Sequence, residues 1–224
     1  MDEWDVVNEP VDVGARSDGL RGGVFMDAFG RDHIARALAT AHAVAPEARL
    51  MINEYGLEYA LPEQRARRAA LLALSRTLID RGAPLHGIGI QAHLDLDKGP
   101  IATAELSAFV AALTALGLSV SITELDCKER DYVRPAAERD QLVSAHVAAF
   151  LSAVLPATGL TSVTCWGLCD DQSWLEVSAA DRARFPGAWS DGSSPGLNRG
   201  LPFAAGGAPK PMRDALRAAF AARR

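Results

Sequence analysis

The chain has 224 residues, a formal net charge of −5, 49% hydrophobic and 23% charged residues, and a sequence pI of about 5.5. This composition is typical of a folded globular protein and excludes an intrinsically disordered one. The mild acidity argues against a nucleic-acid partner, because phosphate binding requires clustered Lys and Arg. Apolar runs such as residues 69–74 are far shorter than the ~20 residues that cross a bilayer, so no membrane partner is expected.

Short apolar segments alternate with longer amphipathic ones, which is the pattern of βα units around a parallel sheet. The predicted strands span residues 3–8, 49–53, 87–93, 119–124 and 162–168. The predicted helices span residues 32–45, 62–81, 103–116, 136–155 and 209–222. We therefore expect an α/β fold of five βα units in a single domain, residues 1–224. A Gly/Ser/Pro-rich stretch, residues 186–207, is predicted to be a long loop at the catalytic face.

The cysteines, an arginine cluster and the first four residues give three smaller expectations. The chain has three cysteines, Cys127, Cys165 and Cys169. They fit neither a disulfide framework nor a four-ligand zinc site, so buried free thiols are predicted. Three arginines cluster within one helical pattern, Arg65, Arg67 and Arg68. We interpret this cluster as a solvated helix face. The acidic start, Met1-Asp2-Glu3-Trp4, does not resemble a signal peptide.

Each predicted strand ends in polar or ionisable side chains. In parallel α/β proteins the carboxyl ends of the strands form the rim of the active site. We therefore expect these residues to converge on one cleft: Asn8, Glu9, Asn53, Glu54, Tyr55, Gln91, His93, Glu124, Asp126, Trp166, Asp170, Asp171 and Trp174.

Two carboxylates, Glu9 and Glu124, each close an apolar strand. Glycoside hydrolysis requires such a pair across a cleft, one to protonate the leaving oxygen and one to attack the anomeric carbon. Either residue alone is better explained as a solvent-facing strand end. Together with the amide and aromatic residues around them, they favour a glycosidase site.

The third and fourth predicted strands supply a supporting group. Gln91 and His93 are two residues apart, so they share one face of their predicted strand. Asp126 lies two residues beyond Glu124. A His93–Asp126 pair would fix the orientation and charge of Glu124, which is the support that a catalytic group needs. A purely structural histidine is the alternative interpretation.

Four motifs, in this order, resemble the endo-1,4-β-xylanases of glycoside hydrolase family 10. They are residues 4–9 (WDVVNE), 87–93 (GIGIQAH), 122–126 (ITELD) and 166–174 (WGLCDDQSW). Lys210-Pro211 before the last helix also resembles the end of that family. The resemblance implies a (β/α)8 TIM barrel and hydrolysis of internal bonds in xylan or xylo-oligosaccharide, with no metal or organic cofactor. By resemblance the protein would act in an extracellular or periplasmic location.

The resemblance also implies a retaining mechanism with assigned roles. Glu9 would be the general acid/base and Glu124 the nucleophile. Asn8 would contact the 2-hydroxyl of the sugar in the −1 subsite, and Tyr55 would lie on the leaving-group side. The remaining members would line, wall or support the −1 subsite: Gln91, His93, Asp126, Trp166 and Trp174.

Two departures from the family pattern stand out. Residues 53–56 read Asn-Glu-Tyr-Gly where the family reads Asn-Asp-Tyr-Asn. The match begins at the family's fourth strand, so three βα units are absent and we expect an incomplete barrel with two exposed sheet edges. We expect such a chain to be weakly active or inactive alone, and to self-associate through the open edges or assemble with a missing N-terminal half. Another retaining β-glycanase of the cellulase or mannanase type, or an inactive fragment, are the alternatives.

Overall fold

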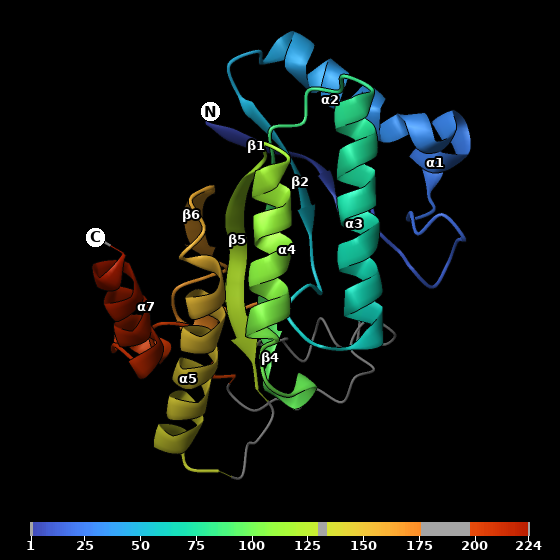
Figure 1. The fold of residues 1–224 in the computed structure, drawn as a ribbon. Coiled ribbons are helices and arrows are strands. Elements are labelled where there is room, and N and C mark those ends of the chain that lie inside the picture. The colour runs from blue at the N-terminus through green and yellow to red at the C-terminus, as the bar shows by residue number, and fades with distance from the viewer. Residues whose placement is uncertain (1, 130–133, 176–197, 224) are drawn as a thin grey trace.

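The computed structural model describes residues 2–129, 134–175 and 198–223 of the chain (Figure 1). Most of the predicted loop at residues 186–207 therefore lies outside the described residues. Within the described ranges, no helix combines the length and the apolar character that crossing a membrane would require.

Within the described ranges, the centre of the molecule is a parallel sheet of six strands. The strands are β1 (Glu3–Asn8), β2 (Arg49–Glu54), β3 (Gly87–Ile90), β4 (His93–Asp95), β5 (Ser119–Lys128) and β6 (Leu160–Cys165). They are arranged in the order β1-β2-β3-β5, and both β4 and β6 pair with β5. Because all pairs are parallel, the carboxyl ends of the strands meet at one edge of the sheet.

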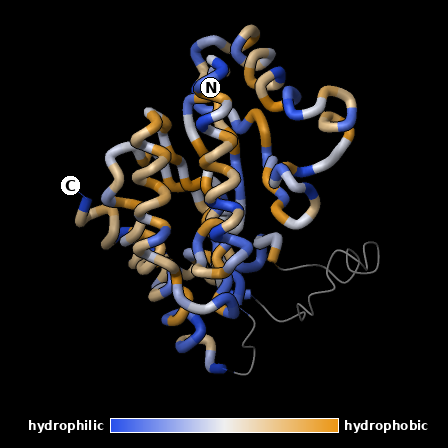
Figure 2. Tube along the Cα trace, turned by 45° about the vertical axis from the view of Figure 1, so that its right-hand side comes forward, coloured by the Kyte–Doolittle hydropathy of each residue, from blue (hydrophilic) through white to orange (hydrophobic). Residues whose placement is uncertain are grey.

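Helices cover one face of this sheet, and α3, α4 and α5 stand side by side in front of the strands in Figure 1. The α-helices are α1 (Val24–Phe29), α2 (His33–Val44), α3 (Pro62–Asp80), α4 (Thr103–Ala115), α5 (Ala136–Val154) and α7 (Pro211–Ala222). Short 3₁₀ turns lie at Gly30–Asp32, Leu96–Lys98, Asp170–Gln172 and Ala205–Gly207. Apolar residues (orange) alternate with hydrophilic ones (blue) along the helices in Figure 2, as expected for helices with one buried side.

The hydrophobic core lies between the central strands and the helices. Every residue of β3, and all but the first of β2, is buried. The fully buried core side chains include Leu38, Leu50, Ile52, Leu71, Ile88, Ile90, Leu106, Leu113, Val120, Ile122, Val147 and Phe150. Removing this apolar area from water is the main force that holds the helices against the sheet.

The sheet is curved so strongly that its first and last strands share a hydrogen-bond network. Glu3 of β1 accepts hydrogen bonds from Ser121 of β5 (2.7 Å) and Thr161 of β6 (3.0 Å). Arg49 of β2 pairs with the same carboxylate. These contacts cross the concave side of the sheet, so the strands form a large sector of a barrel.

The barrel sector has two open edges, formed by β1 and β6. In the described part of the chain, β1 pairs only with β2, and β6 pairs only with β5. Apart from the buried Leu160, the residues of both edge strands are exposed or partly buried, unlike those of β3, which are all buried. The expected α/β barrel type with an incomplete set of βα units is confirmed.

Several details differ from the sequence-based expectation. Helix α1 was not predicted, β5 extends four residues beyond its predicted end, and β6 begins and ends earlier than predicted. The predicted strand at residues 87–93 is broken by Ala92, whose φ of 61° interrupts the extended backbone between β3 and β4. The predicted solvated arginine face is wrong for Arg67 and Arg68, which are only 3% and 6% exposed. Among the cysteines, which are all free, Cys127 is buried, whereas Cys165 and Cys169 are only partly buried.

Candidate active site

Each oxygen of the Glu124 carboxylate has a hydrogen-bond partner. The side chain of Glu124 is 14% exposed. Its Oε1 accepts a hydrogen bond from Asn53 Nδ2 at 2.8 Å, and its Oε2 lies 3.2 Å from His93 Nε2. Thr123 Oγ1 donates to Asn53 Oδ1 at 2.7 Å, which fixes the orientation of the Asn53 amide. The Asn53 amide hydrogens therefore face the carboxylate.

His93 is held between two carboxylates. Its Nδ1 lies 2.9 Å from Asp126 Oδ1, while its Nε2 faces Glu124. Burial disfavours the charged ring, but the hydrogen bonds and charges of Asp126 and Glu124 outweigh burial and raise the pKa of His93. Only the imidazolium form can donate to both carboxylates at once. Asp126 accepts a further hydrogen bond from Trp174 Nε1 at 2.5 Å, and the Trp174 ring lies 5.0 Å from the His93 ring.

Amide side chains connect the two glutamates. Gln91 Nε2 donates to Glu9 Oε1 and to Asn8 Oδ1, both at 3.2 Å. Asn53 Nδ2 donates to Asn8 Oδ1 at 3.0 Å and also to Glu124. The chain Glu9–Gln91–Asn8–Asn53–Glu124 is therefore continuous, and the two carboxylates belong to one cluster at the strand ends.

The surroundings of Glu9 differ from those of Glu124. The Glu9 side chain is 34% exposed, and its Oε2 lies 3.4 Å from Nη2 of Arg21. Arg21 Nη2 also donates to the Tyr55 hydroxyl at 3.2 Å, which places Tyr55 next to Glu9. One carboxylate is thus enclosed by an amide and a histidine, and the other is accessible and lies beside an arginine.

A third carboxyl group is held close to Glu124. Asp5 lies on β1, and burial, followed by the negative charges of Glu124 and Glu3, raises its pKa. The charge of Glu124 therefore makes Asp5 harder to ionise.

Four predicted rim residues lie outside this cluster. Asp171 is exposed, and Glu54 is buried in an ion pair with Arg67. Asp170 is buried in an ion pair with Lys210, so it is a structural residue. Trp166 follows β6 and is 48% exposed, and its backbone N–H donates to Leu125 of β5 at 3.1 Å. Among the described residues, the Trp166 indole makes no hydrogen bond to the cluster.

Two residues of this site, Thr123 and Arg21, were not predicted from the sequence. Asn53 was predicted among the polar strand ends, but its role as the bridge between Asn8 and Glu124 depends on a side-chain orientation that sequence does not give. Thr123 fixes that orientation. Arg21 lies in an irregular loop, where no periodicity points toward the strands.

Comparison with known proteins shows to which family the chain belongs. The model of glycosyl hydrolase family 10 matches residues 1–219. The chain belongs to glycosyl hydrolase family 10. It is 33% identical over 174 residues to endo-1,4-beta-xylanase 1 of Humicola insolens. That alignment covers 77% of this chain and 38% of the Humicola insolens enzyme. It is 33% identical over 182 residues to the endo-1,4-beta-xylanase of Geobacillus stearothermophilus, which covers 77% and 52%.

Solved structures of family 10 have the same fold. Xylanase 10B from Thermotoga petrophila RKU-1, crystallised in complex with xylobiose, superposes with a TM-score of 0.79 at 23% identity. The superposition covers 100% of this chain and 61% of that one. The family 10 chain described here thus spans about half the length, or less, of the curated relatives and about three fifths of the solved barrel.

Proposed function

We propose that this chain carries the catalytic centre of a retaining endo-1,4-β-xylanase, with Glu124 as the nucleophile and Glu9 as the general acid/base. The observation that carries the proposal is the continuous amide network between two carboxylates with contrasting surroundings. Retaining glycosidases require one ionised carboxylate to attack carbon and a second group to exchange a proton with the leaving oxygen.

In the first step, Glu124 attacks the anomeric carbon while the glycosidic C–O bond breaks. Asn53 and His93 hold the two oxygens of Glu124, so the carboxylate reacts from a fixed orientation. Glu9 transfers its proton to the departing sugar oxygen. Tyr55, which lies next to Glu9 through Arg21, is placed to contact the departing sugar.

In the second step, Glu9 accepts a proton from a water molecule that attacks the same carbon. The ester bond to Glu124 breaks, and the sugar leaves with its original anomeric configuration. Asn8 carries the amide oxygen to which Gln91 and Asn53 both donate, which leaves its Nδ2 available for a sugar hydroxyl.

The proposed substrate is xylan or xylo-oligosaccharide. It is supported by the two endo-1,4-beta-xylanase relatives and by the xylobiose complex of the Thermotoga petrophila protein. Because polymeric xylan is too large to enter a cell, the proposal places the reaction in an extracellular or periplasmic location.

Mechanism-based labelling tests the proposal without requiring rapid turnover. A fluoro-xylobioside with a dinitrophenolate leaving group needs no acid catalyst, so its attack reports the nucleophile alone. We expect intact-protein mass spectrometry to show one added fluoroxylobiosyl group on Glu124. The Glu124→Gln variant should remain unlabelled, and an unlabelled parent chain would contradict the proposal.

Hydrolysis of polymeric xylan is a second, separate measurement. We expect the isolated chain to hydrolyse xylan far more slowly than full-length relatives, because the strands of the described residues form only part of a barrel wall. Parallel assays on a β-1,4-glucan distinguish a cellulase-type activity. A purified monomer that hydrolyses xylan at the rate of a full-length enzyme would refute the expected impairment.

A further inference from the structure

The backbone that carries Glu9 has a conformation that needs external support. Glu9 has a φ of 55°, in the left-handed region that residues with a Cβ rarely adopt. Its N–H donates to the Asn53 carbonyl at 2.7 Å, and its carbonyl accepts from Arg21 Nε at 2.6 Å. The position of the Glu9 carboxylate therefore depends on how firmly the following residues are held.

A buried ion pair grips the chain two residues after Glu9. The N–H of Val11 donates to Glu54 Oε2 at 2.9 Å, and its carbonyl accepts from Arg67 Nη1 at 2.7 Å. Arg67 Nη1 also lies 3.2 Å from Glu54 Oε1. The Glu54 and Arg67 side chains are 0% and 3% exposed. The backbone N–H and carbonyl of Val11 are thus each held by one member of this ion pair. We call the Glu54–Arg67 pair the Val11 clamp.

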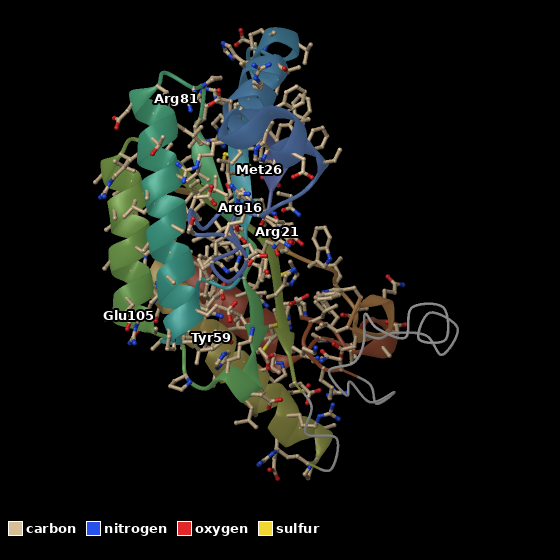
Figure 3. The ribbon with its side chains drawn as sticks, turned by 90° about the vertical axis from the view of Figure 1, so that its right-hand side faces the viewer. Arg16, Arg21, Met26, Tyr59, Arg81 and Glu105 are labelled. Atoms are coloured by element: carbon tan, nitrogen blue, oxygen red, sulfur yellow. The ribbon has the colours of Figure 1, made fainter. Side chains whose placement is uncertain are left out.

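The Val11 clamp also holds Tyr55. The N–H of Tyr55 donates to Glu54 Oε1 at 3.1 Å. The guanidinium of Arg67 lies 4.2 Å from the centre of the Tyr55 ring, and its Nη2 donates to the Tyr55 hydroxyl at 3.3 Å. The same hydroxyl accepts from Arg21, so the contacts run from Arg67 through Tyr55 and Arg21 to Glu9. Figure 3 shows Arg21 on the loop between β1 and α1.

Burying the charged groups of Glu54 and Arg67 is energetically unfavourable. Burial, partly offset by the N–H groups of Val11 and Tyr55 and by Arg67, raises the pKa of Glu54 to about 7. The buried Nε of Arg67 has no hydrogen-bond partner among the described residues. Buried ion pairs are weak sources of stability and are often replaced by apolar residues without loss. A role in orienting the loop accounts for keeping this pair.

We propose that Glu54 and Arg67 are positioning residues for Glu9. Together they fix the loop that follows Glu9, so that its carboxylate stays against Gln91 and beside Tyr55. The inference rests on the proposed function, because it assigns a task to the acid/base. In the hydrogen bonds described above, the side chains of Glu54 and Arg67 bond to Val11, Tyr55 and each other, and not to the side chains of Glu124, Asn53 or His93. Loss of the clamp should therefore impair the steps that use Glu9 and spare the attack by Glu124.

The experiment separates the two steps with the same fluoro-xylobioside reagent. Labelling needs only Glu124, whereas release of the label by water needs Glu9 as a base. Azide releases the label without a base: it attacks the anomeric carbon, the ester bond to Glu124 breaks, and a glycosyl azide leaves. We compare the parent chain with Arg67→Met and Glu54→Gln. Arg68→Met is the matched control, because Arg68 is the next residue of α3, is also buried, and donates to the carbonyls of Leu57 (2.7 Å) and Tyr59 (3.0 Å) instead.

We expect Arg67→Met and Glu54→Gln to be labelled within about threefold of the parent rate and to release the label in water about 10- to 100-fold more slowly, as loss of well-placed base catalysis predicts. Azide should restore release to within about threefold of the parent, and Arg68→Met should change neither step. Thermal unfolding identifies a variant that fails to fold. If Arg67→Met does not fold, the labelling and release rates of Arg67→Lys and Glu54→Gln test the inference by the same criteria.

Two results would overturn the inference. Release in water at the parent rate would show that the Val11 clamp does not position Glu9. Labelling and release that fall together, without rescue by azide, would show a general structural defect. If the parent chain takes no label at all, the proposed function itself fails, and the inference falls with it.

Discussion

Asn53 is the residue on which the geometry of the candidate site depends most. It is 3% exposed and donates to both Asn8 and Glu124. We expect Asn53→Ala to slow labelling of Glu124 by about 10- to 100-fold, because a hydrogen bond to a charged group contributes roughly 1.5–3 kcal/mol. Thr123→Val, which only frees the Asn53 amide to rotate, should have a smaller effect. Equal losses in the two variants would contradict this ranking.

The charge of His93 gives a pH dependence that can be measured. Its raised pKa means that the folded chain binds the proton more tightly than the unfolded chain. The stability that this provides is fully present below the unfolded pKa of about 6.5 and is lost as pH rises through the raised folded value. We expect the advantage of the parent over His93→Gln in the free energy of unfolding to shrink over that range. Urea denaturation at a series of pH values measures it, and an advantage that grows with pH would contradict the charged state.

Single residues also show where sequence interpretation failed. Arg67 and Arg68 lie on the stripe of α3 that also includes Gln64, Leu71 and Ser75, which are all buried. The helical period therefore placed both arginines toward the interior. Their charge led to the opposite interpretation, because a buried guanidinium requires partners that are distant in sequence, such as Glu54 and the loop carbonyls.

At the scale of elements, strand and helix positions were largely predictable. Period and length of the apolar segments located β1, β2 and five of the six α-helices in the described residues to within about two residues. The break between β3 and β4 was not predictable, because an alanine with a φ of 61° has no sequence signature. Despite that break, Gln91 and His93 both reach the cluster, since each contacts one of the two glutamates.

The attachment of α7 depends on a buried cation. Lys210, directly before α7, lies 2.8 Å and 3.0 Å from the two oxygens of Asp170, and it also donates to the Arg199 carbonyl. We expect Lys210→Met to lower the free energy of unfolding by about 3–5 kcal/mol, because Asp170 would be left charged and unpaired. Adding Asp170→Asn should recover part of that loss in urea denaturation. A double variant less stable than Lys210→Met would contradict this explanation.

At the scale of the whole molecule, an apolar groove of about 770 Å³ lies beside β1. Trp4, Val24, Phe25 and Phe29 line it and are 36–74% exposed. Exposed apolar surface beside an unpaired strand is a site of association. The sequence predicted the open edge from the motif order, but it could not show the groove, which depends on how α1 and α2 pack.

We expect the chain to self-associate as its concentration rises, and the double substitution Phe25→Glu and Phe29→Glu to shift it toward the monomer. Sedimentation velocity measures the change. Leu142→Glu is the control, because Leu142 is 44% exposed but lies on α5, away from the groove. A chain that is monomeric at every concentration, or a control variant that dissociates equally, would contradict the assignment of the groove.

The hydrogen bond between Glu3 and Thr161 has a consequence for synthesis of the protein. Thr161 is made 158 residues after Glu3. At about 5–20 residues per second, roughly 8–30 s pass on the ribosome before the two can meet. During that interval Glu3 lacks the hydrogen bonds from β5 and β6 that curve the sheet. Translation speed over the intervening codons, and not only the finished sequence, should therefore influence the yield of correctly curved protein.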